Sequence, residues 1–268
     1  MLSQTLLYSD RDFVRRSLAS NVRLDGRELH ESRELIMCKD IALFPTALQG
    51  VKIEVPDSKT SLMIGLNAEI FLVSDGKKAE LKDLVELEVK STISRTIGED
   101  PEFAEIEAVA SKFLLSRLDI EKLKISDNVH WKIFLDVLVV GDLYLCDLDY
   151  LFEGLTETLC TAEFPNVRVS FNSWSEEHVY ETLEDSKALF NREDMLTVKV
   201  IGEIDSKIVL DMNNDELRSV DSFYVVSVNQ KGDITCIEKL DGQAIDVNKL
   251  SMVLKKLTEF AKSLRKTA

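Results

Sequence analysis

Each half of this chain carries short strand-like segments followed by an amphipathic helix, and this order restricts the possible folds more than any other feature. Alternating apolar and polar residues predict half-buried strands, whereas apolar residues spaced three and four apart predict helices. Because the strands are grouped before the helices, we expect an α+β protein with two sheet-and-helix lobes. The predicted strands cover residues 35–44, 51–55, 62–73, 84–89, 131–140, 195–201, 207–211, 222–228 and 233–239.

The helix that starts near residue 100 has the clearest boundary signal. Asp100 can cap the helix, Pro101 fits the first turn, and Glu102 lies near the positive end of the helix dipole. The first four strands are expected to form an antiparallel meander, and residues 131–140 a central strand. The predicted helices cover residues 1–20, 101–114, 147–162 and 246–264.

The chain has 268 residues, of which 45% are hydrophobic, so it can form one large core or two smaller ones. A polar, acidic stretch separates the two groups of strands and is expected to connect the lobes. The predicted organisation is an N-terminal helix at 1–20, a first lobe at 21–170, an acidic connector at 171–193 and a second lobe at 194–268.

Two tryptophans differ in their expected roles. Trp131 starts an apolar strand and is expected in the core, whereas Trp174 lies in the acidic connector, where docking onto another protein explains an aromatic residue more easily. The N-terminal helix is a second candidate for protein contacts. Its apolar candidates are Leu6, Leu7, Phe13 and Val14.

The formal net charge of −15 predicts weak RNA binding by the isolated chain, because affinity for RNA depends on Lys and Arg that neutralise phosphates. An acidic subunit can still belong to an RNA-handling assembly whose basic partners line the RNA path. The longest apolar run, Ile133–Val140, contains Asp136 and is too short to span a bilayer. The first residues lack a signal-peptide pattern, so no membrane contact is expected.

No cofactor or metal site is predicted. The cysteines form no C-x-x-C pair and are expected to be reduced thiols, as in cytosolic or nuclear proteins. The histidines have no neighbouring residues that would form a catalytic triad. These residues are Cys38, Cys146, Cys160, Cys236, His30, His130 and His178.

A charged motif, RLDGR at Arg23–Arg27, is followed six residues later by Arg33 and precedes the first predicted strand. In combination with the strand at 131–140 and the segment at 209–228, this order resembles the RNase PH family. That family contains phosphorolytic 3′ exoribonucleases and their inactive ring-forming relatives. The resemblance covers about residues 21–264 and implies the RNase PH-like fold, which is ribosomal protein S5 domain 2-like.

By this resemblance, active members carry two carboxylates six residues apart. Such a pair can hold a metal ion or act as a general acid at the leaving 3′ oxygen. An ungapped match from Asp211 onward places Leu217 and Phe223 at these two positions. Since neither side chain can bind a cation or transfer a proton, no catalytic residue is predicted.

The same segment contains other acids. Glu216 matches one of two glutamates that precede the carboxylate pair in active members. Asp215 and Asp221 are also six residues apart, but two residues earlier than the matched positions. With a gapped match they would be a functional pair; otherwise they are solvated loop acids.

Active relatives also carry a Gly-Gly-Asn or Gly-Gly-Thr turn that binds phosphate ahead of a helix. Here the matching residues are Tyr144-Leu145-Cys146 and then Asp147, whose bulk and charge disfavour a phosphate. In the loop that faces RNA in active relatives, Arg95 remains. It is the candidate RNA-binding residue, with an ordinary surface arginine as the alternative.

The resemblance implies a non-catalytic structural ring subunit of the RNA exosome, which supports 3′-to-5′ RNA processing and degradation. The expected partners are other RNase PH-like subunits in a hetero-hexameric ring, exosome cap proteins, and RNA in the assembled channel. The expected locations are the nucleus, nucleolus and cytoplasm. Two alternatives stay open: an active phosphorolytic 3′ exoribonuclease that uses Asp215 and Asp221, and an acidic interaction scaffold unrelated to RNA.

Overall fold

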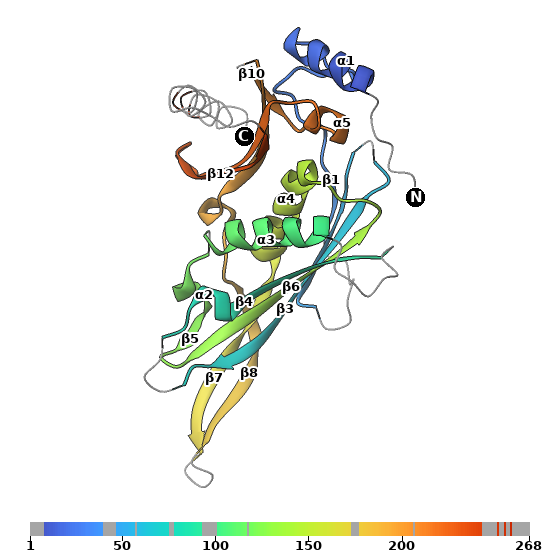
Figure 1. Cartoon of the computed structure of the whole chain (residues 1–268). Helices are drawn as coiled ribbons and strands as arrows, with labels where there is room; N and C mark the ends of the chain where they lie inside the picture. The colour runs from blue at the N-terminus through green and yellow to red at the C-terminus, as the bar shows by residue number, and fades with distance from the viewer. Residues whose placement is uncertain are drawn as a thin grey trace. The chain divides into compact units, whose positions relative to one another are not determined.

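A computed structural model of the chain shows an α+β fold (Figure 1). It divides into two compact units, and neither unit is continuous in sequence. The first unit comprises residues 1–35, 143–153 and 196–268, and the second comprises 36–142 and 154–195. The structure describes residues 8–39, 47–56, 58–74, 78–92, 101–116, 118–172, 177–205, 207–242, 251, 255 and 258.

The predicted lobe boundaries at residues 170 and 194 differ from this division. Helix α4 (Leu148–Thr161) contributes its first residues to the first unit and its remainder to the second unit. A sequence pattern identifies the helix but not which residues its two ends pack against, so it could not reveal a discontinuous unit.

The second unit is built on a six-stranded sheet with the order β1-β2-β3-β6-β4, in which β5 pairs with the start of β6. The strands are β1 (Ile36–Cys38), β2 (Gln49–Glu54), β3 (Ser61–Leu72), β4 (Val85–Ser91), β5 (Lys124–Ser126) and β6 (Val129–Val140). The predicted meander is correct for β1–β3 but wrong for β4, which pairs in parallel with β6. Helix α3 (Pro101–Leu115) lies between these two strands in the chain and supplies the crossover that a parallel pair requires.

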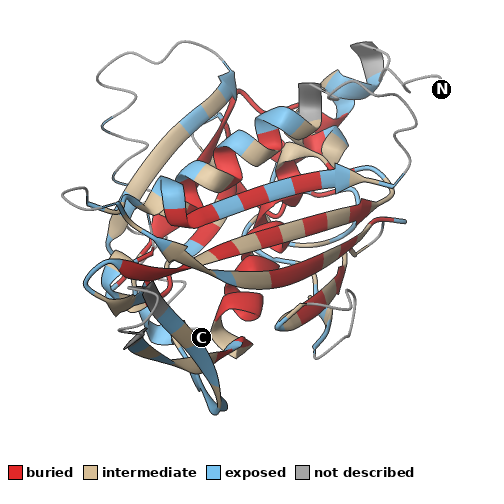
Figure 2. Ribbon diagram, turned by 90° about the horizontal axis from the view of Figure 1, so that it is seen from below, coloured by how far each residue is buried: buried red, intermediate tan, exposed pale blue. Residues whose placement is uncertain are grey.

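Alternating burial along the central strands builds the core of this unit (Figure 2). The predicted stripe of α3 is buried at Ile106, Ala110, Phe113 and Leu114. Trp131 on β6 is buried, and its ring centroid lies 5.8 Å from that of Phe164, so the expectation that Trp131 belongs to the core is confirmed. Short helices precede β4 and β5, namely α2 (Leu81–Leu84) and η1 (Ile120–Leu123).

The stretch predicted as an acidic connector instead contributes to a β-hairpin of the second unit. Strand β7 (Glu163–Asn172) pairs antiparallel with β8 (Glu177–Ala188), and η3 (Arg192–Asp194) follows. The alternation of Val167 and Val169 with polar neighbours is typical of a strand with one apolar face. Trp174 lies outside the described residues.

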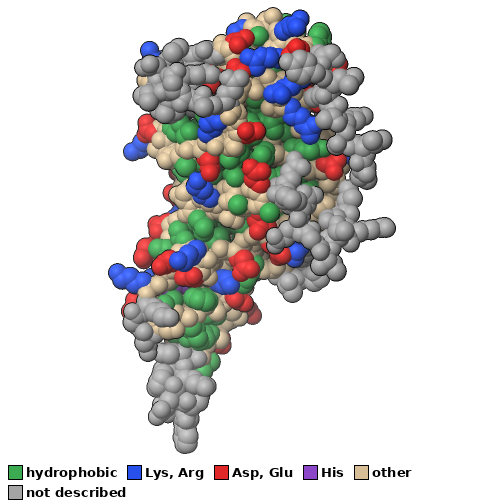
Figure 3. All heavy atoms as spheres, viewed as in Figure 1, with side chains coloured by type: hydrophobic (Ala, Val, Ile, Leu, Met, Phe, Trp, Pro, Cys, Tyr) green, Lys and Arg blue, Asp and Glu red, His purple; other side chains and the backbone are tan. Residues whose placement is uncertain are grey.

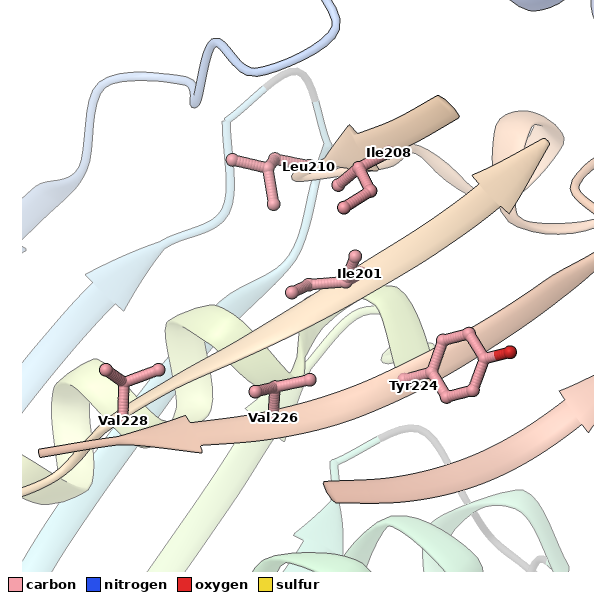
Figure 4. Close-up of a cluster of buried hydrophobic side chains, with 6 residues drawn as sticks. All are labelled: Ile201, Ile208, Leu210, Tyr224, Val226 and Val228. Atoms are coloured by element: carbon pink, nitrogen blue, oxygen red, sulfur yellow. The ribbon is translucent and has the colours of Figure 1, made fainter. Parts of the chain in front are cut away.

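The first unit is built on a four-stranded antiparallel sheet with the order β10-β9-β11-β12. Its strands are β9 (Thr197–Ile204), β10 (Lys207–Leu210), β11 (Ser222–Val228) and β12 (Ile234–Gly242), close to the predicted ranges. Every residue of β11 is buried. A cluster of apolar side chains from three strands lies on the sheet (Figure 4). The predicted helix at 246–264 lies outside the described residues, except that residues 251, 255 and 258 are helical.

Helices α1 (Tyr8–Ala19), η2 (Leu145–Asp147) and α5 (Asn214–Leu217) complete the first unit. Val14 and Leu18 of α1 are buried, whereas Phe13 is 62% exposed. Val14 therefore belongs to a core, which corrects its assignment to a surface for other proteins. Leu6 and Leu7 lie outside the described residues. In the part of the chain that the structure describes, no helix is long and apolar enough to cross a membrane.

Candidate functional site

The RLDGR motif contacts the turn that follows β10, entirely within the first unit. The buried guanidinium of Arg23 donates from Nε to Oε1 of Glu216 at 2.9 Å and from Nη2 to Oε2 at 2.6 Å. It also donates to the backbone oxygens of Leu210 at 2.9 Å and of Asp211 at 2.8 Å. Two parallel charged hydrogen bonds fix the plane of the guanidinium, so Arg23 attaches the N-terminal segment to this turn.

Asp211 binds the other two arginines of this region, Arg27 and Arg33. Its carboxylate accepts hydrogen bonds from Nη2 of Arg33 at 2.6 Å, from Nη1 of Arg27 at 2.8 Å and from the hydroxyl of Tyr150 at 2.9 Å. Asp211 is 2% exposed and has a left-handed backbone, with φ of 43°. Its burial opposes ionisation, but the hydrogen bonds and charge of Arg33 prevail and lower the pKa of Asp211 to about 2. This carboxylate is therefore ionised and fully engaged by the protein's own cations.

The centre of the RLDGR motif, Asp25–Arg27, forms a local turn. Gly26 has φ of 84°, a conformation that glycine adopts without strain. The Asp25 carboxylate accepts from the backbone N–H of Arg27 at 3.1 Å and from its Nη2 at 2.7 Å. The motif thus forms its own turn and then directs Arg27 toward Asp211.

Glu216 has a structural role in α5 as well as in the pair with Arg23. Asn213 caps this short helix by accepting from the backbone N–H of Glu216 at 2.9 Å, and Glu216 accepts from the backbone N–H of Asn213 at 3.0 Å. At the two positions matched to catalytic carboxylates, Leu217 is half-buried at the end of α5 and Phe223 is buried in β11.

The alternative carboxylate pair is divided between two environments. Asp215 is exposed on α5. Asp221 is 8% exposed, and its Oδ1 accepts from Nη1 of Arg15 on α1 at 2.6 Å, while its Oδ2 accepts from the backbone N–H of Asp205 at 3.2 Å. Asp221 thus attaches α1 to the turn at Asp205. Neither interpretation from the sequence, a catalytic residue or a solvated loop acid, included this role.

The segment matched to the phosphate-binding turn is a single turn of 3₁₀-helix. The carboxylate of Asp147 accepts from the backbone N–H of Tyr144 at 3.0 Å. Burial raises the pKa of Asp147 to about 6, although hydrogen bonding and Arg33 oppose the shift. A buried protein carboxylate therefore occupies the backbone donor at the start of this turn, and the expectation that the turn disfavours phosphate stays a prediction.

Two further polar residues at the start of α4 were missed by sequence reasoning. Tyr150 donates to Asp211, as described above, and burial raises the pKa of Tyr150. Asp149 is buried, accepts from the backbone N–H of Val200, and lies 3.5 Å from Nζ of Lys199. Burial raises the pKa of Asp149, while Lys199 opposes that shift. In the sequence these residues lie between two members of the apolar stripe, Leu148 and Leu151, and belong to no motif, so no signal marked them.

Among the side chains that the structure describes, the remaining candidates do not assemble into a second site. His30 is exposed and His130 is buried, and burial lowers the pKa of His130. All four cysteines are free thiols. Within the described ranges, no group of three His, Cys, Asp or Glu residues is arranged to hold a metal ion. Arg95 lies outside the described residues, so its expected contact with RNA stays a prediction.

The face of the molecule shown in Figure 3 carries both positive and negative side chains. On the face shown in Figure 3, Lys and Arg side chains are interspersed with Asp and Glu side chains. Two arginines of the N-terminal region are buried, because the side chains of Arg23 and Arg33 are 0% and 8% exposed. The cations of the motif therefore serve internal pairs.

Comparisons with known proteins identify the fold. No family model matches the chain, and no curated protein matches its sequence. Among solved structures, an archaeal exosome core aligns with a TM-score of 0.65 and 17% identity, covering 97% of this chain and 96% of its own. An Archaeoglobus fulgidus exosome with RNA bound to its active site aligns with a TM-score of 0.66 and 17% identity, covering 97% of each chain. The chain therefore has the RNase PH-like fold found in subunits of the exosome core.

Proposed function

We propose that this chain is a ring subunit of an RNA exosome and that its contribution is structural rather than catalytic. The fold supports the first part, because the match extends over nearly the whole chain and leaves no large region for an unrelated activity. The observation that carries the second part is that the two matched carboxylate positions hold the apolar residues Leu217, at the end of α5, and Phe223, buried in β11. The Asp211 carboxylate, where that match begins, is engaged by two arginines and a tyrosine. A carboxylate held in this way is not available as a proton donor or as an open cation ligand.

The neighbouring residues support the same proposal. Leu217 and Phe223 supply no ionisable group, and Asp221 is paired with Arg15. Asp147 adds a carboxylate where an active enzyme would receive phosphate. An active site for phosphorolysis needs the opposite charge balance, since the attacking inorganic phosphate is itself an anion.

Within the family, we propose a relationship to the eukaryotic exosome ring subunit called ribosomal RNA-processing protein forty-two. The segments at Phe164–Val169 and Ser222–Ile237 carry this similarity. The proposed partners are other RNase PH-like subunits in a hetero-hexameric ring, exosome cap proteins, and RNA in the assembled channel. The proposed locations are the nucleus, nucleolus and cytoplasm.

The test is an RNA degradation assay with the purified full-length chain, single-stranded RNA, inorganic phosphate and Mg²⁺. We expect no release of nucleoside diphosphates above background. Release that is abolished by Asp221→Asn or Asp215→Asn would establish the phosphorolytic alternative. Co-expression with RNase PH-like subunits tests the ring, and a chain that never co-purifies with them would favour the unrelated scaffold.

A further inference from the structure

The β7–β8 hairpin has an incomplete hydrogen-bonding pattern. It forms a two-stranded sheet, and among the described residues neither strand pairs with a third. Strand β8 is 12 residues long, which exceeds the usual length of a strand. A long strand at the edge of a sheet presents a row of backbone donors and acceptors that can pair with another chain.

The two strands of the hairpin differ in accessibility. Phe164 at the base of β7 is buried, and Pro165, Asn166 and Val167 are half-buried. By contrast, residues 184–188 of β8 are all exposed. The accessible edge is therefore the outer edge of β8, away from its pairing with β7.

The faces of the hairpin also differ. Val169 pairs with Tyr180, and both are half-buried on one face. Ser170 pairs with Val179 on the opposite face, where both are exposed and Val179 is 44% exposed. An added strand would extend both faces and would cover apolar side chains that the hairpin leaves partly in water.

The charge of the hairpin specifies what kind of strand fits. Among the side chains of the two strands that the structure describes are four carboxylates, Glu163, Glu181, Glu184 and Asp185, and two cations, Arg168 and Lys187. One of the cations is used locally, because Arg168 lies 3.7 Å from Glu181. The excess of negative charge on β8 favours a strand rich in Lys and Arg, since opposite charges across neighbouring strands stabilise pairing and like charges oppose it.

We propose that the outer edge of β8 binds a basic extended segment of a neighbouring protein by adding a strand to the hairpin. This inference rests on the proposed function, in that the neighbour is another RNase PH-like subunit. A second copy of this chain is disfavoured, because its net charge is −15 and its own β8 carries the same acids. Main-chain hydrogen bonds provide the affinity, and the acids select a basic partner.

The test compares two triple variants in the full-length chain, co-expressed with its RNase PH-like partner subunits. The first reverses the β8 acids through Glu181→Lys, Glu184→Lys and Asp185→Lys. The matched control reverses exposed acids elsewhere in the second unit through Asp83→Lys, Glu105→Lys and Glu121→Lys. Both variants change the net charge equally, and melting of the isolated chains confirms that each is folded.

We expect the β8 variant to raise the Kd for the partner subunits by about tenfold or more, and the control to leave it nearly unchanged. Hydrogen exchange of the wild-type complex should show new protection at the amides of residues 179–187. Equal binding by both variants, no protection, or self-association through β8 would overturn the proposal while leaving ring membership intact. Failure of the wild-type chain to join the partner subunits would instead remove the proposed function and this inference with it.

Discussion

The arginine–carboxylate cluster of the first unit and the β7–β8 hairpin of the second unit use charge in opposite ways. Around Asp211 the charged side chains are buried and paired within the chain. On β8 the side chains of Glu181, Glu184 and Asp185 are exposed, and the ion pair between Arg168 and Glu181 is about two-thirds exposed on each side. Removing one partner of a buried ion pair strongly destabilises a protein, because the other partner is left as a buried charge without a counterion. Exposed ion pairs contribute little to stability. The first region therefore stabilises the first unit, and the second presents the exposed acids that we propose select a partner.

The largest expected effect comes from breaking the buried pair between Arg23 and Glu216. Arg23→Ala leaves Glu216 buried without its cation and should lower the free energy of unfolding by about 3–5 kcal/mol. Urea unfolding of the isolated chain measures the change. Glu184→Ala on the exposed strand is the matched comparison and should change stability by less than about 0.5 kcal/mol. Equal losses in the two variants would show that the contrast between the regions is wrong.

Asp147 sharpens the comparison, because burial raises its pKa, whereas the pKa of the buried Asp211 is lowered. The Asp147 pKa of about 6 in the folded chain lies above that of an unfolded aspartate, so the folded state binds the proton more tightly. Stability contributed by the protonated form is present below pH about 4 and is lost as the pH rises through about 6. Asp147→Asn should therefore raise the free energy of unfolding by up to about 3 kcal/mol at pH 7.5, since each pKa unit corresponds to about 1.4 kcal/mol.

The control for this prediction is the same variant at low pH. Near pH 4 the wild-type carboxyl is protonated in the folded state and about half protonated in the unfolded state, so the advantage of Asp147→Asn should shrink to about 0.5 kcal/mol. Asp211 titrates in the other direction, because its lowered pKa contributes stability above pH about 4 that is lost as the pH falls toward about 2. A constant advantage of Asp147→Asn between pH 4 and pH 7.5 would contradict the assignment of a burial-raised pKa.

A smaller effect is expected at the ion pair that attaches α1. Arg15→Ala leaves the buried Asp221 without its charged donor and should cost about 1–2 kcal/mol. Limited proteolysis should then cut near α1 more readily than in the wild-type chain. The exposed Arg16 on the same helix provides the control, and Arg16→Ala should leave both stability and cleavage nearly unchanged.

The smallest effect should come from the ion pair on the hairpin. Arg168→Ala and Glu181→Ala, alone and combined, should each change the free energy of unfolding by less than about 1 kcal/mol. A double-mutant cycle measured by thermal melting gives the coupling energy directly. A coupling as large as that of the buried pair between Arg23 and Glu216 would mean that the hairpin acids stabilise the monomer rather than remain available to a partner.

Much of the fold could be predicted from the pattern of apolar residues. The strands of the first unit lie close to their predicted ranges, and the stripe of α3 is buried as expected, because one-sided burial imposes periods of two and of about 3.6 residues on the sequence. The parallel pairing of β4 with β6 could not be predicted in the same way. Periodicity records which face of a strand is buried but not which strand lies beside it.

The candidate site could be located in part. The RLDGR motif, Asp211 and Glu216 were singled out in the sequence. Their mutual contacts join residues 187 to 193 positions apart, so no local sequence pattern predicts them. Asp221 was considered as a catalytic residue or a solvated acid, and its pairing with Arg15 fits neither description. Tyr150 had no sequence signal at all.

The sequence by itself determined the fold class, most strands, the position of α3 and the absence of ionisable side chains at positions 217 and 223, because these depend on local periodicity and residue identity. Only the tertiary structure decided the discontinuous units, the partners of the buried charges and the exposed edge of β8. The physical reason is that burial and ion pairing depend on which distant segments come together. The same aspartate can be a solvated acid, a buried anion held by arginine, or a neutral carboxyl, according to the residues that surround it.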